Sequence, residues 1–441
     1  MVLDLIRRLV PRRLLLLYHR WLATFAALRY GRPSRKMVVI GVTGTDGKTT
    51  TALLISQLLQ AAGKLVGLSS GVYFQTGQRR WRNEMHMTMP GRMRLHRLLR
   101  QMVDAGCQYA VIEVSSEGLL QHRHLGIDFD AAVLTNLTAE HLETHGGLAA
   151  YRRTKGRLFH QIIRSGDKRL DGLPVKKFTV VNLDDASAEY FLGFWAEEHH
   201  GVTLRDKPAT LARVKNKLRI WRAESVKTEP NGSQFVVERH HLRLPLPGRY
   251  NVYNALEAVV TAAALGIDWS TIERGLAQAS HIPGRWEEFA LPNGARAIVD
   301  YALTPAALVQ FYQAVEQFGS KRIIAVFGAA GGGRDRWKRP DLGEIASRHA
   351  SVIILTTDDP YDEDPGAITG EIAAGISAAS RAEVFMILDR REAIRRALSL
   401  AQPDDVVAIT GMGAETSMVI KGKKVPWSDA DTVKELIASL G

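Results

Sequence analysis

The 441-residue chain contains one cysteine, Cys107. A single thiol excludes an internal disulfide framework and a zinc site built from several cysteines, and this usage is typical of a reducing compartment. RNA-binding motifs and zinc-finger spacing are also missing, which argues against nucleic acid as a partner. We therefore expect a cytoplasmic protein whose formal net charge of +12 favours other anions, such as phosphates, nucleotides or an anionic membrane.

Acidic side chains are almost absent from residues 1–36, in which Asp4 is the only one. Arginines interrupt the leucine-rich runs of this segment, so we expect neither a membrane span nor a secretory signal. Two interpretations remain. Either the segment forms one or two helices that pack on the next domain, or it forms a basic amphipathic helix in peripheral contact with a membrane.

Short apolar runs alternate with segments of helical spacing through the rest of the chain. Residues 37–44, 109–116, 129–137 and 178–182 are expected strands, and a helix is expected to follow the first of them. This alternation predicts an α/β fold with a mostly parallel sheet, whose ligands lie at the carboxyl ends of the strands. Residues 200–245 are more polar and alternating, which predicts an antiparallel patch.

A second series of strand-like runs, among them RAIVDYA, RIIAVFG and DDVVAITG, follows Gly284. Helical patterns separate these runs, so a second α/β unit is expected. We therefore divide the chain into a basic helical segment at residues 1–36, a central nucleotide-binding domain at 37–283 and a Rossmann-like C-terminal domain at 284–441.

The glycine-rich stretch GVTGTDGKTT, residues 41–50, differs from the common phosphate-loop pattern by one position. That pattern requires a glycine where this sequence has Val42. In the predicted strand–loop–helix context, backbone amides would surround phosphate oxygens, Lys48 would offset their charge and the Thr49 hydroxyl would hold Mg²⁺. The alternative is a chance glycine turn before a helix, which this context disfavours.

Polar side chains follow the next two predicted strands. Glu113 ends the strand at residues 109–116, and a carboxylate beside a phosphate loop is a natural Mg²⁺ ligand. Asn136, His141 and His145 follow the next strand, at the edge where an open sheet binds ligands. Histidines at this spacing only suggest a metal, because single histidines are more often structural.

These motifs together resemble those of the Mur ligases. The order G-x-x-G-T-D-G-K-T-T, E-V-S-S, T-N-L-x-x-E-H-L and Y-x-x-x-K is similar to theirs, and the shifted glycine is the family's own form of the loop. GRYNVYNALEA, PGRWEEF, VDYALTP and GMGAETSMVIKG follow in the family's order. Within the family, the chain most resembles the UDP-N-acetylmuramoyl-tripeptide synthetases.

The resemblance implies an ATP-dependent amide ligase of peptidoglycan precursor synthesis, which uses ATP and Mg²⁺. ATP would phosphorylate the terminal carboxylate of a UDP-N-acetylmuramoyl-peptide, and the amine of an amino acid would then displace phosphate from the acyl phosphate. Such a reaction requires cations and metals, because a carboxylate and a phosphoryl group repel each other.

The resemblance also implies roles for individual residues. Those implied in catalysis are Lys48, Glu113, His141 and Lys155. Those implied in ATP binding are Gly44, Thr45, Asp46, Gly47, Lys48, Thr49, Thr50, Asn254, Arg285 and Asp300. Those implied in holding Mg²⁺ are Thr49, Glu113, His141 and Lys155, the last as a carbamate. Those implied in donor binding are Thr88, Ser115, Gln121 and Arg123, and those in the amino-acid pocket are Arg334, Asp358, Gly411 and Glu415.

Two departures from the family pattern bear on the substrates. Residues 1–36 stand where the family carries a uridine-binding domain, so a different donor, for example a lipid-linked one, stays open. Tyr361 stands in D-D-P-Y where enzymes that add diaminopimelate carry D-N-P-R, whose arginine forks onto the distal carboxylate. We therefore predict that diaminopimelate is not recognised in that way, which leaves lysine, ornithine or a neutral residue.

Two alternatives to this function stay open. One is another amino-acid ligase of the superfamily, folylpolyglutamate-like or pseudomurein-type, although the folate branch carries G-T-N-G-K-G where this chain has Thr49 and Thr50. The other is a catalytically silent, membrane-associated binding homologue. The joint presence of Lys48, Glu113, His141 and Lys155 argues against a silent protein.

Overall fold

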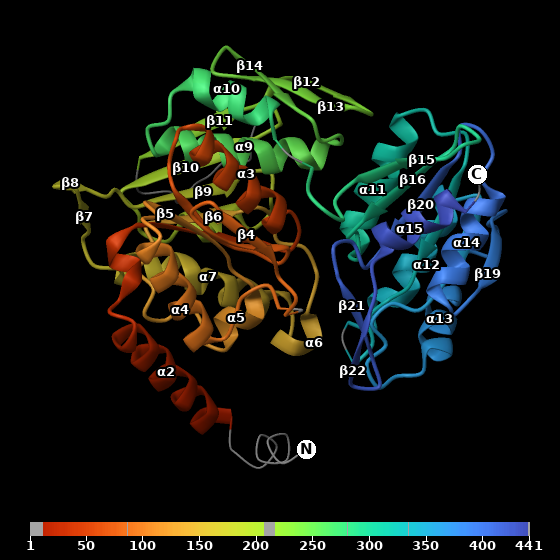
Figure 1. The fold of residues 1–441 in the computed structure, drawn as a ribbon, viewed down its shortest axis with the longest axis horizontal. Coiled ribbons are helices and arrows are strands. Elements are labelled where there is room, and N and C mark those ends of the chain that lie inside the picture. Colours follow the sequence, from red (N-terminus) through yellow and green to blue (C-terminus); the bar gives the residue numbers. More distant parts are fainter. Residues whose placement is uncertain (1–11, 86, 207–216, 280, 334, 440–441) are drawn as a thin grey trace.

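The structure is a computed structural model that describes residues 12–85, 87–206, 217–279, 281–333 and 335–439. Two sheets, each flanked by helices, lie side by side (Figure 1). The larger sheet has the strand order β11-β10-β9-β6-β1-β5-β2-β3-β4, and all of its pairings are parallel except those of β3. Its strands are β1 (Val38–Thr43), β2 (Val66–Ser69), β3 (Tyr73–Thr76), β4 (Arg79–Arg82), β5 (Tyr109–Glu113), β6 (Ala131–Leu134), β9 (Phe178–Asn182), β10 (Glu198–Thr203) and β11 (Leu218–Arg222).

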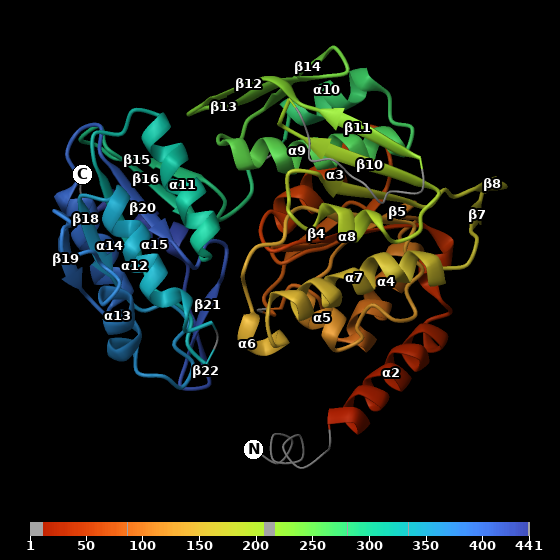
Figure 2. The same ribbon diagram turned by 180° about the vertical axis from the view of Figure 1, so that it is seen from behind.

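The central strands of this sheet are apolar along their whole length because helices cover both faces. Every residue of β1 is buried, for example. One face packs against α3 (Lys48–Ala61), α9 (Arg249–Ala264) and α10 (Trp269–Ala277). The opposite face, the lower one in Figure 2, packs against α4 (Arg92–Asp104), α5 (Ser116–Leu120), α7 (Leu148–Arg164) and α8 (Ala188–Leu192).

The smaller sheet has the order β15-β16-β20-β17-β18-β19 and is parallel except at β15. Its strands are β15 (Glu287–Ala290), β16 (Arg296–Asp300), β17 (Ile323–Phe327), β18 (Val352–Leu355), β19 (Glu383–Met386) and β20 (Val406–Thr410). On one face lie α11 (Pro305–Gln317), α12 (Lys338–His349) and α13 (Pro365–Ala373), and on the other α14 (Arg390–Leu400) and α15 (Asp429–Ala438). The predicted second α/β series therefore exists as a separate sheet.

The antiparallel patch predicted for residues 200–245 is partly right. Strands β12 (Glu224–Glu229), β13 (Gly232–Val237) and β14 (His240–Leu244) form an antiparallel sheet. The prediction is wrong for β10 and β11, which extend the larger sheet in parallel. Strand β11 is polar because it is the edge strand of that sheet and part of its surface meets solvent.

Short elements complete the chain. They are η1 (Pro33–Lys36), α6 (Leu142–His145), the β7 (Arg169–Leu170) and β8 (Leu173–Pro174) hairpin, and the β21 (Ser417–Ile420) and β22 (Lys423–Pro426) hairpin. Of the N-terminal segment, residues 1–11 lie outside the described part. Helix α2 (Arg12–Arg29) contacts α4 and buries Ala23, Ala26 and Ala27, as the packed-helix interpretation requires. Among the described residues, no helix combines the length and apolar character needed to cross a bilayer.

Candidate functional site

A cleft of about 600 Å³ lies between the two sheets, where loops at the carboxyl ends of their parallel strands face each other. Parallel strands bring all of their carboxyl ends to one edge, so loops that are distant in sequence meet there. The predicted site residues in its lining are Gly44, Thr45, Asp46, Gly47, Lys48, Thr49, Thr50, Thr88, Glu113, Ser115, Arg123, His141, Lys155, Asn254, Arg285, Asp300, Asp358, Gly411 and Glu415.

The loop between β1 and α3 has the shape that a phosphate group requires. Gly47 adopts a φ of 80°, and a Cβ there would lie 2.2 Å from Oδ1 of Asn254, so no other residue fits. Helix α3 begins at the next residue, and the free amides of its first turn favour an anion. The Nζ atom of Lys48 donates to the carbonyl of Thr45 at 2.7 Å, which holds the cation beside the loop.

The two predicted Mg²⁺ ligands next to this loop are in contact. The hydroxyl of Thr49 donates to Oε2 of Glu113 at 3.0 Å, and the amide of Gly71 donates to the same oxygen at 2.7 Å. Glu113 is only 2% exposed, so its charge has little solvent to stabilise it. A hydroxyl and a buried carboxylate beside a phosphate loop are the hard oxygen donors that Mg²⁺ prefers, and these residues fit that ion.

Lys155 on α7 reaches the phosphate loop from the opposite face of the sheet. It is 1% exposed, and its Nζ atom donates to the carbonyl of Gly44 at 2.6 Å. Burial, and then the nearby charge of Lys48, lower the pKa of Lys155 well below its usual value. Because an uncharged amine can attack CO₂ and an ammonium group cannot, this environment suits the carbamate that the resemblance implies.

His141 lies where the two sheets contact each other. Asp335, from the loop between β17 and α12, accepts hydrogen bonds from the backbone amides of His141 at 2.9 Å and Leu142 at 3.0 Å. Nδ1 of His141 lies 3.2 Å from the same carboxylate. Burial opposes ionisation of Asp335, but the hydrogen bond and charge of His141 lower its pKa to about 2. Asp335 therefore stays charged and ties the two halves of the cleft together.

Glu140 adds a third possible ligand to this contact. One ligand atom from each of Glu140, His141 and Asp335 lies within 4.8 Å of the others, close enough for a shared metal ion. Oε1 of Glu140, however, accepts from Nζ of Lys338 at 2.8 Å, in a nearly buried ion pair. The cation of Lys338 already balances part of the negative charge, and the resulting ion pair joins the two halves of the protein.

Carboxylates dominate the side of the cleft that the smaller sheet supplies. Asp358 is 8% exposed, and burial raises its pKa to about 6 although Arg390 acts in the opposite sense. Burial and the charge of Asp359 raise the pKa of Glu415 to about 7. The backbone of Gly411 lies close to Asp358, since a Cβ added at Gly411 would lie 2.3 Å from Oδ2 of Asp358. This region favours a positively charged ligand such as an ammonium group.

The residues predicted to hold the nucleoside lie between these two regions. Asp300 ends β16 and accepts from the amides of Trp286 and Ala302, each at 2.8 Å. The guanidinium of Arg285 lies over the ring of Tyr301, 4.3 Å from its centroid. A flat aromatic ring and a guanidinium provide surfaces on which a nucleobase can stack.

One predicted substrate residue, Gln121, is not in the lining of the cleft. Its Oε1 accepts from Nη2 of Arg123 at 2.8 Å, so it orients that guanidinium. Arg123 also donates to the carbonyl of Met89. Arg334 lies outside the described residues.

Sequence reasoning missed three side chains of the site. Asp335 and Lys338 follow the glycine turn after β17, and only their partners across the cleft reveal a role. Glu257 on α9 is fully buried, and its Oε2 accepts from the hydroxyl of Thr51 at 3.0 Å. Burial raises its pKa well above the usual value. A glutamate inside the apolar run of GRYNVYNALEA was the signal that could have identified it.

A phosphate loop beside a buried hydroxyl–carboxylate pair, faced by a second parallel sheet that carries carboxylates, is the arrangement of a nucleotide-dependent ligase. Residues 42–262 match the Mur ligase middle domain, and residues 284–413 match the Mur ligase, glutamate ligase domain. The chain belongs to the Mur ligase family.

Curated relatives carry more specific names. The chain is 39% identical over 435 residues to a UDP-N-acetylmuramyl-tripeptide synthetase of Roseiflexus sp., which covers 95% of this chain and 82% of the relative. It is 38% identical over 414 residues to a UDP-N-acetylmuramoyl-L-alanyl-D-glutamate–2,6-diaminopimelate ligase of Geobacillus thermodenitrificans, covering 93% and 81% respectively. These relatives agree with the branch that the sequence motifs indicate.

Solved structures support the same fold. A UDP-N-acetylmuramoyl-L-alanyl-D-glutamate–2,6-diaminopimelate ligase has a TM-score of 0.58 at 29% identity, over 92% of this chain and 79% of that one. A folylpolyglutamate synthase of Mycobacterium tuberculosis has a TM-score of 0.68 at 17% identity, over 89% and 92%. The higher score of the second reflects shared architecture alone, because identity this low does not report activity.

Proposed function

We propose that this chain is an ATP-dependent ligase that joins an amino acid to a UDP-N-acetylmuramoyl-peptide in peptidoglycan precursor synthesis. One observation carries the proposal: Lys48 and the Thr49–Glu113 pair share one cleft with Asp358 and Glu415. Cations and metal ligands on one side suit phosphoryl transfer. Carboxylates on the other side suit the ammonium group of an amino acid.

The proposed reaction has two steps. The γ-phosphate of ATP moves to the terminal carboxylate of the donor, which gives an acyl phosphate and ADP. The amine of the amino acid then attacks the acyl carbon, an amide bond forms and phosphate leaves. Lys48 and the loop amides hold and orient the phosphoryl oxygens. A Mg²⁺ ion held by Thr49 and Glu113 would neutralise further negative charge on these oxygens.

Lys155 contributes to this reaction as a carbamate. Its neutral amine nitrogen forms a bond to the carbon of CO₂ and releases one proton, so an uncharged group beside Gly44 becomes an anion. The carbamate oxygens and His141 would be the residues that hold a second Mg²⁺. The low pKa of Lys155 supports this role, since carbamylation needs the neutral amine.

Glu415 takes part in the second step. The incoming amine arrives as an ammonium ion and must lose a proton before it can attack. A carboxylate whose pKa lies at about 7 accepts that proton near neutral pH. Asp358, which lines the same cleft, would hold the side-chain cation of an acceptor such as lysine or ornithine.

The amino acid that is added is one whose side chain needs no arginine at position 361. Tyr361 adopts a φ of 52°. Its ring packs against Gly332, because a Cβ added at Gly332 would lie 3.3 Å from the ring. Without a guanidinium there, the distal carboxylate of diaminopimelate lacks the forked partner that D-N-P-R enzymes provide. Lysine, ornithine or a neutral amino acid therefore fits better.

We also divide the chain into domains at residues 37–283 and 284–441, which close on each other when substrates bind. The Asp335–His141 and Lys338–Glu140 contacts support closure along this boundary. The segment 1–36 gives the cytoplasmic enzyme a peripheral contact with the membrane.

The test measures phosphate release from ATP with UDP-N-acetylmuramoyl-L-alanyl-D-glutamate and a panel of amino acids, and reads product masses by mass spectrometry. A mass gain equal to one amino acid less water is expected, without diaminopimelate as the preferred acceptor. Lys48→Ala is the control, because Nζ of Lys48 contacts only the carbonyl of Thr45 among the described residues and its loss should not unfold the protein. No turnover with any amino acid, in protein that still binds ATP, would refute this donor, and lipid-linked and folate donors would be assayed next.

A further inference from the structure

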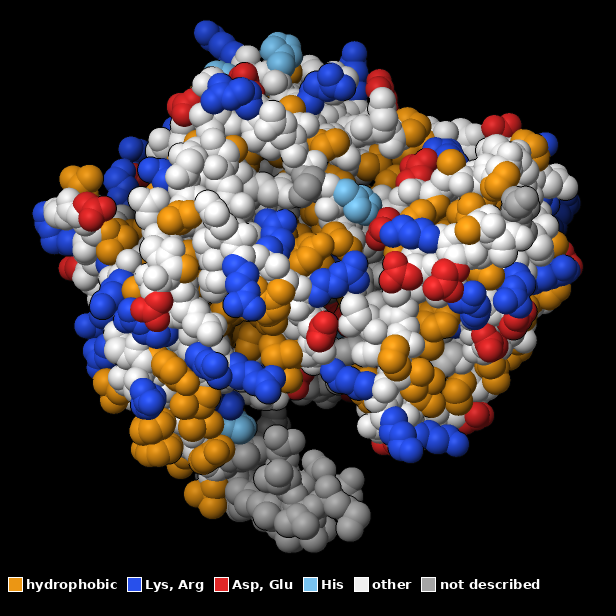
Figure 3. All heavy atoms as spheres, viewed as in Figure 1, with side chains coloured by type: hydrophobic (Ala, Val, Ile, Leu, Met, Phe, Trp, Pro, Cys, Tyr) orange, Lys and Arg blue, Asp and Glu red, His pale blue; other side chains and the backbone are white. Residues whose placement is uncertain are grey.

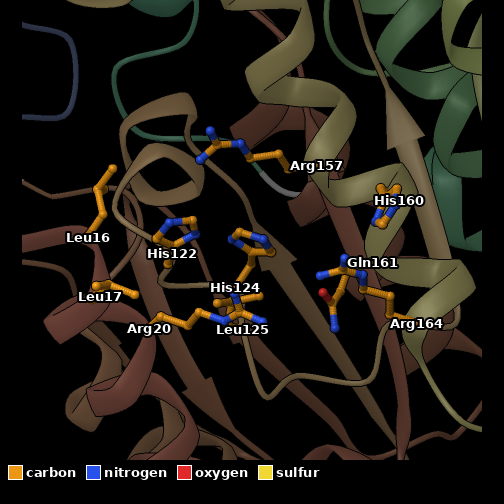
Figure 4. A pocket seen from close by; sticks show the side chains of 10 residues that line it. All are labelled: Leu16, Leu17, Arg20, His122, His124, Leu125, Arg157, His160, Gln161 and Arg164. Atoms are coloured by element: carbon orange, nitrogen blue, oxygen red, sulfur yellow. The ribbon is translucent and has the colours of Figure 1, made fainter. Parts of the chain in front are cut away.

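A second cavity, also of about 600 Å³, lies between α2, the turn after α5 and α7. Arginine and histidine side chains surround it (Figure 4). They are Arg20, His122, His124, Arg157, His160 and Arg164. Among the described residues, no aspartate or glutamate lines this cavity, so positive charge converges there without a balancing carboxylate.

The three arginines have few partners of their own. Arg157 donates to the carbonyl of Leu119 at 3.1 Å, which satisfies one N–H but supplies no negative charge. Within the part of the chain that the structure describes, neither Arg20 nor Arg164 forms an ion pair or a side-chain hydrogen bond. Three guanidinium groups around one cavity repel one another, and an anion between them would relieve that repulsion.

His124 supplies an independent indication that a ligand binds here. It lines the cavity and is 3% exposed, and its Nδ1 atom has no hydrogen-bond partner among the described residues. Burial, followed by His122 and the nearby arginines, lowers the pKa of His124 to about 3. A buried ring nitrogen without a partner is costly in a protein interior, and a ligand oxygen or a hydroxyl would offset that cost.

The outer face of α2, next to this cavity, is apolar. The large exposed side chains on this helix fall at helical spacing and are Leu14, Leu17, Tyr18, Trp21, Phe25 and Leu28. Trp21 is 62% exposed, and its ring stacks on that of Phe25 with centroids 5.4 Å apart. Figure 3 shows hydrophobic side chains gathered over α2 at the lower left of the view. Leu17 belongs to both the apolar face and the lining of the cavity, so the two features are continuous.

We propose that this cavity binds the phosphate group of an anionic membrane lipid, while the apolar face of α2 lies in the interfacial region of the bilayer. An amphiphile matches both features, because its phosphate needs cations and its acyl chains need an apolar surface. A soluble phosphate or nucleotide would occupy the cavity but would leave the exposed tryptophan and leucines of α2 in water. Arg123, which lines the ligase cleft, lies between His122 and His124, so this contact would place the donor side of the cleft close to the membrane.

The test is co-sedimentation of the full chain with vesicles of phosphatidylcholine alone or of phosphatidylcholine mixed with phosphatidylglycerol. We expect binding to the anionic vesicles. Replacing both Arg20→Gln and Arg164→Gln should weaken it roughly 30-fold, since each cation at an anionic surface contributes about fivefold. The matched control pair, Arg153→Gln with Arg381→Gln, removes two exposed arginines outside the cavity and should change binding less than about twofold. Trp21→Ser should also weaken binding, without a change in charge.

Three results would overturn the proposal. If both double variants lose vesicle binding to the same extent, the total charge of the protein, and not the cavity, attracts the vesicles. Equal binding to both kinds of vesicle would exclude recognition of an anionic lipid. The third result combines two assays: inorganic phosphate stabilises the unmodified protein saturably in a thermal-shift assay, and that protein binds no vesicles. If the Arg20 and Arg164 double variant loses the stabilisation, the cavity binds a soluble anion. Turnover in the ligase assay without vesicles should be the same for all these variants, because none of the substituted residues lines the ligase cleft.

Discussion

Replacement of Asp358 by asparagine should stabilise the folded protein in a pH-dependent way while it impairs ligation. Burial raises the pKa of Asp358 from 3.8 to about 6, so the folded state binds the proton more tightly than the unfolded chain does. The contribution of Asp358 to the free energy of unfolding is therefore fully present below pH 3.8, and it is lost as pH rises through about 6. The Asp358→Asn variant carries no such charge and avoids that loss.

The size of the effect follows from the interval between the two pKa values. At about 1.4 kcal/mol per pKa unit, this interval corresponds to at most about 3 kcal/mol. Asparagine keeps an oxygen that can accept from the amide of Asp359, a hydrogen bond of 2.7 Å. Its new N–H groups need partners, and an unmade hydrogen bond costs about 1 kcal/mol or more. We therefore expect a net gain of about 1 to 2 kcal/mol at pH 8 and almost none at pH 4.

The assay is urea unfolding of both proteins at pH 4 and pH 8, followed by tryptophan fluorescence, in parallel with phosphate release. Asp362→Asn is the matched control, because it removes an exposed carboxylate from the same loop and should change stability by less than about 0.5 kcal/mol. Equal stabilisation at both pH values, or destabilisation of Asp358→Asn at pH 8, would refute the argument that burial of this charge weakens the fold. Full ligase activity in Asp358→Asn would refute its assignment to the amino-acid pocket.

The remaining predictions concern three other positions. Removal of CO₂ from buffer and protein should slow phosphate release, and bicarbonate should restore the rate. The Lys155→Met variant should show no response to bicarbonate. If bicarbonate does not change the activity of the unmodified enzyme, the carbamate is excluded. Asp335→Ala removes the acceptor of two backbone amides, so the two halves should separate and the radius of gyration in X-ray scattering should rise. The control Asp341→Ala, at a half-buried position on α12, should leave it unchanged. Tyr361→Arg should raise the rate of diaminopimelate incorporation at least about tenfold, as expected for a charge-assisted forked pair, and no gain would show that another group selects the acceptor.

Local sequence was sufficient to predict the phosphate loop and the strands that surround it. The run before Gly44 is apolar, the glycines recur at close spacing and helical periodicity follows, so strand, loop and helix were predictable from neighbours in the chain. Glu113 was predictable as a partner of this loop because parallel strands end at a common edge, and its contact with Thr49 agrees with that geometry.

The alternation of polar and apolar residues across 200–245 misjudged β11, a partly exposed edge strand that pairs in parallel with β10. Alternation reports which face of a strand meets solvent, and an edge strand in a parallel sheet has the same exposure as an antiparallel one. The direction of pairing depends on the connection between strands, which single-residue patterns do not contain.

The sequence by itself determined the family of this protein, its two series of strands and the chemistry of its phosphate loop, since these depend on residues that are close together in the chain. Only the tertiary structure decided which side chains meet across the cleft. Asp335 and His141 are separated by 194 positions, and nothing in either segment specifies the other. The basic cavity beside α2 likewise draws Arg20, His124 and Arg164 from three segments. The packing of whole helices sets such contacts, so they emerge only when the complete chain has folded.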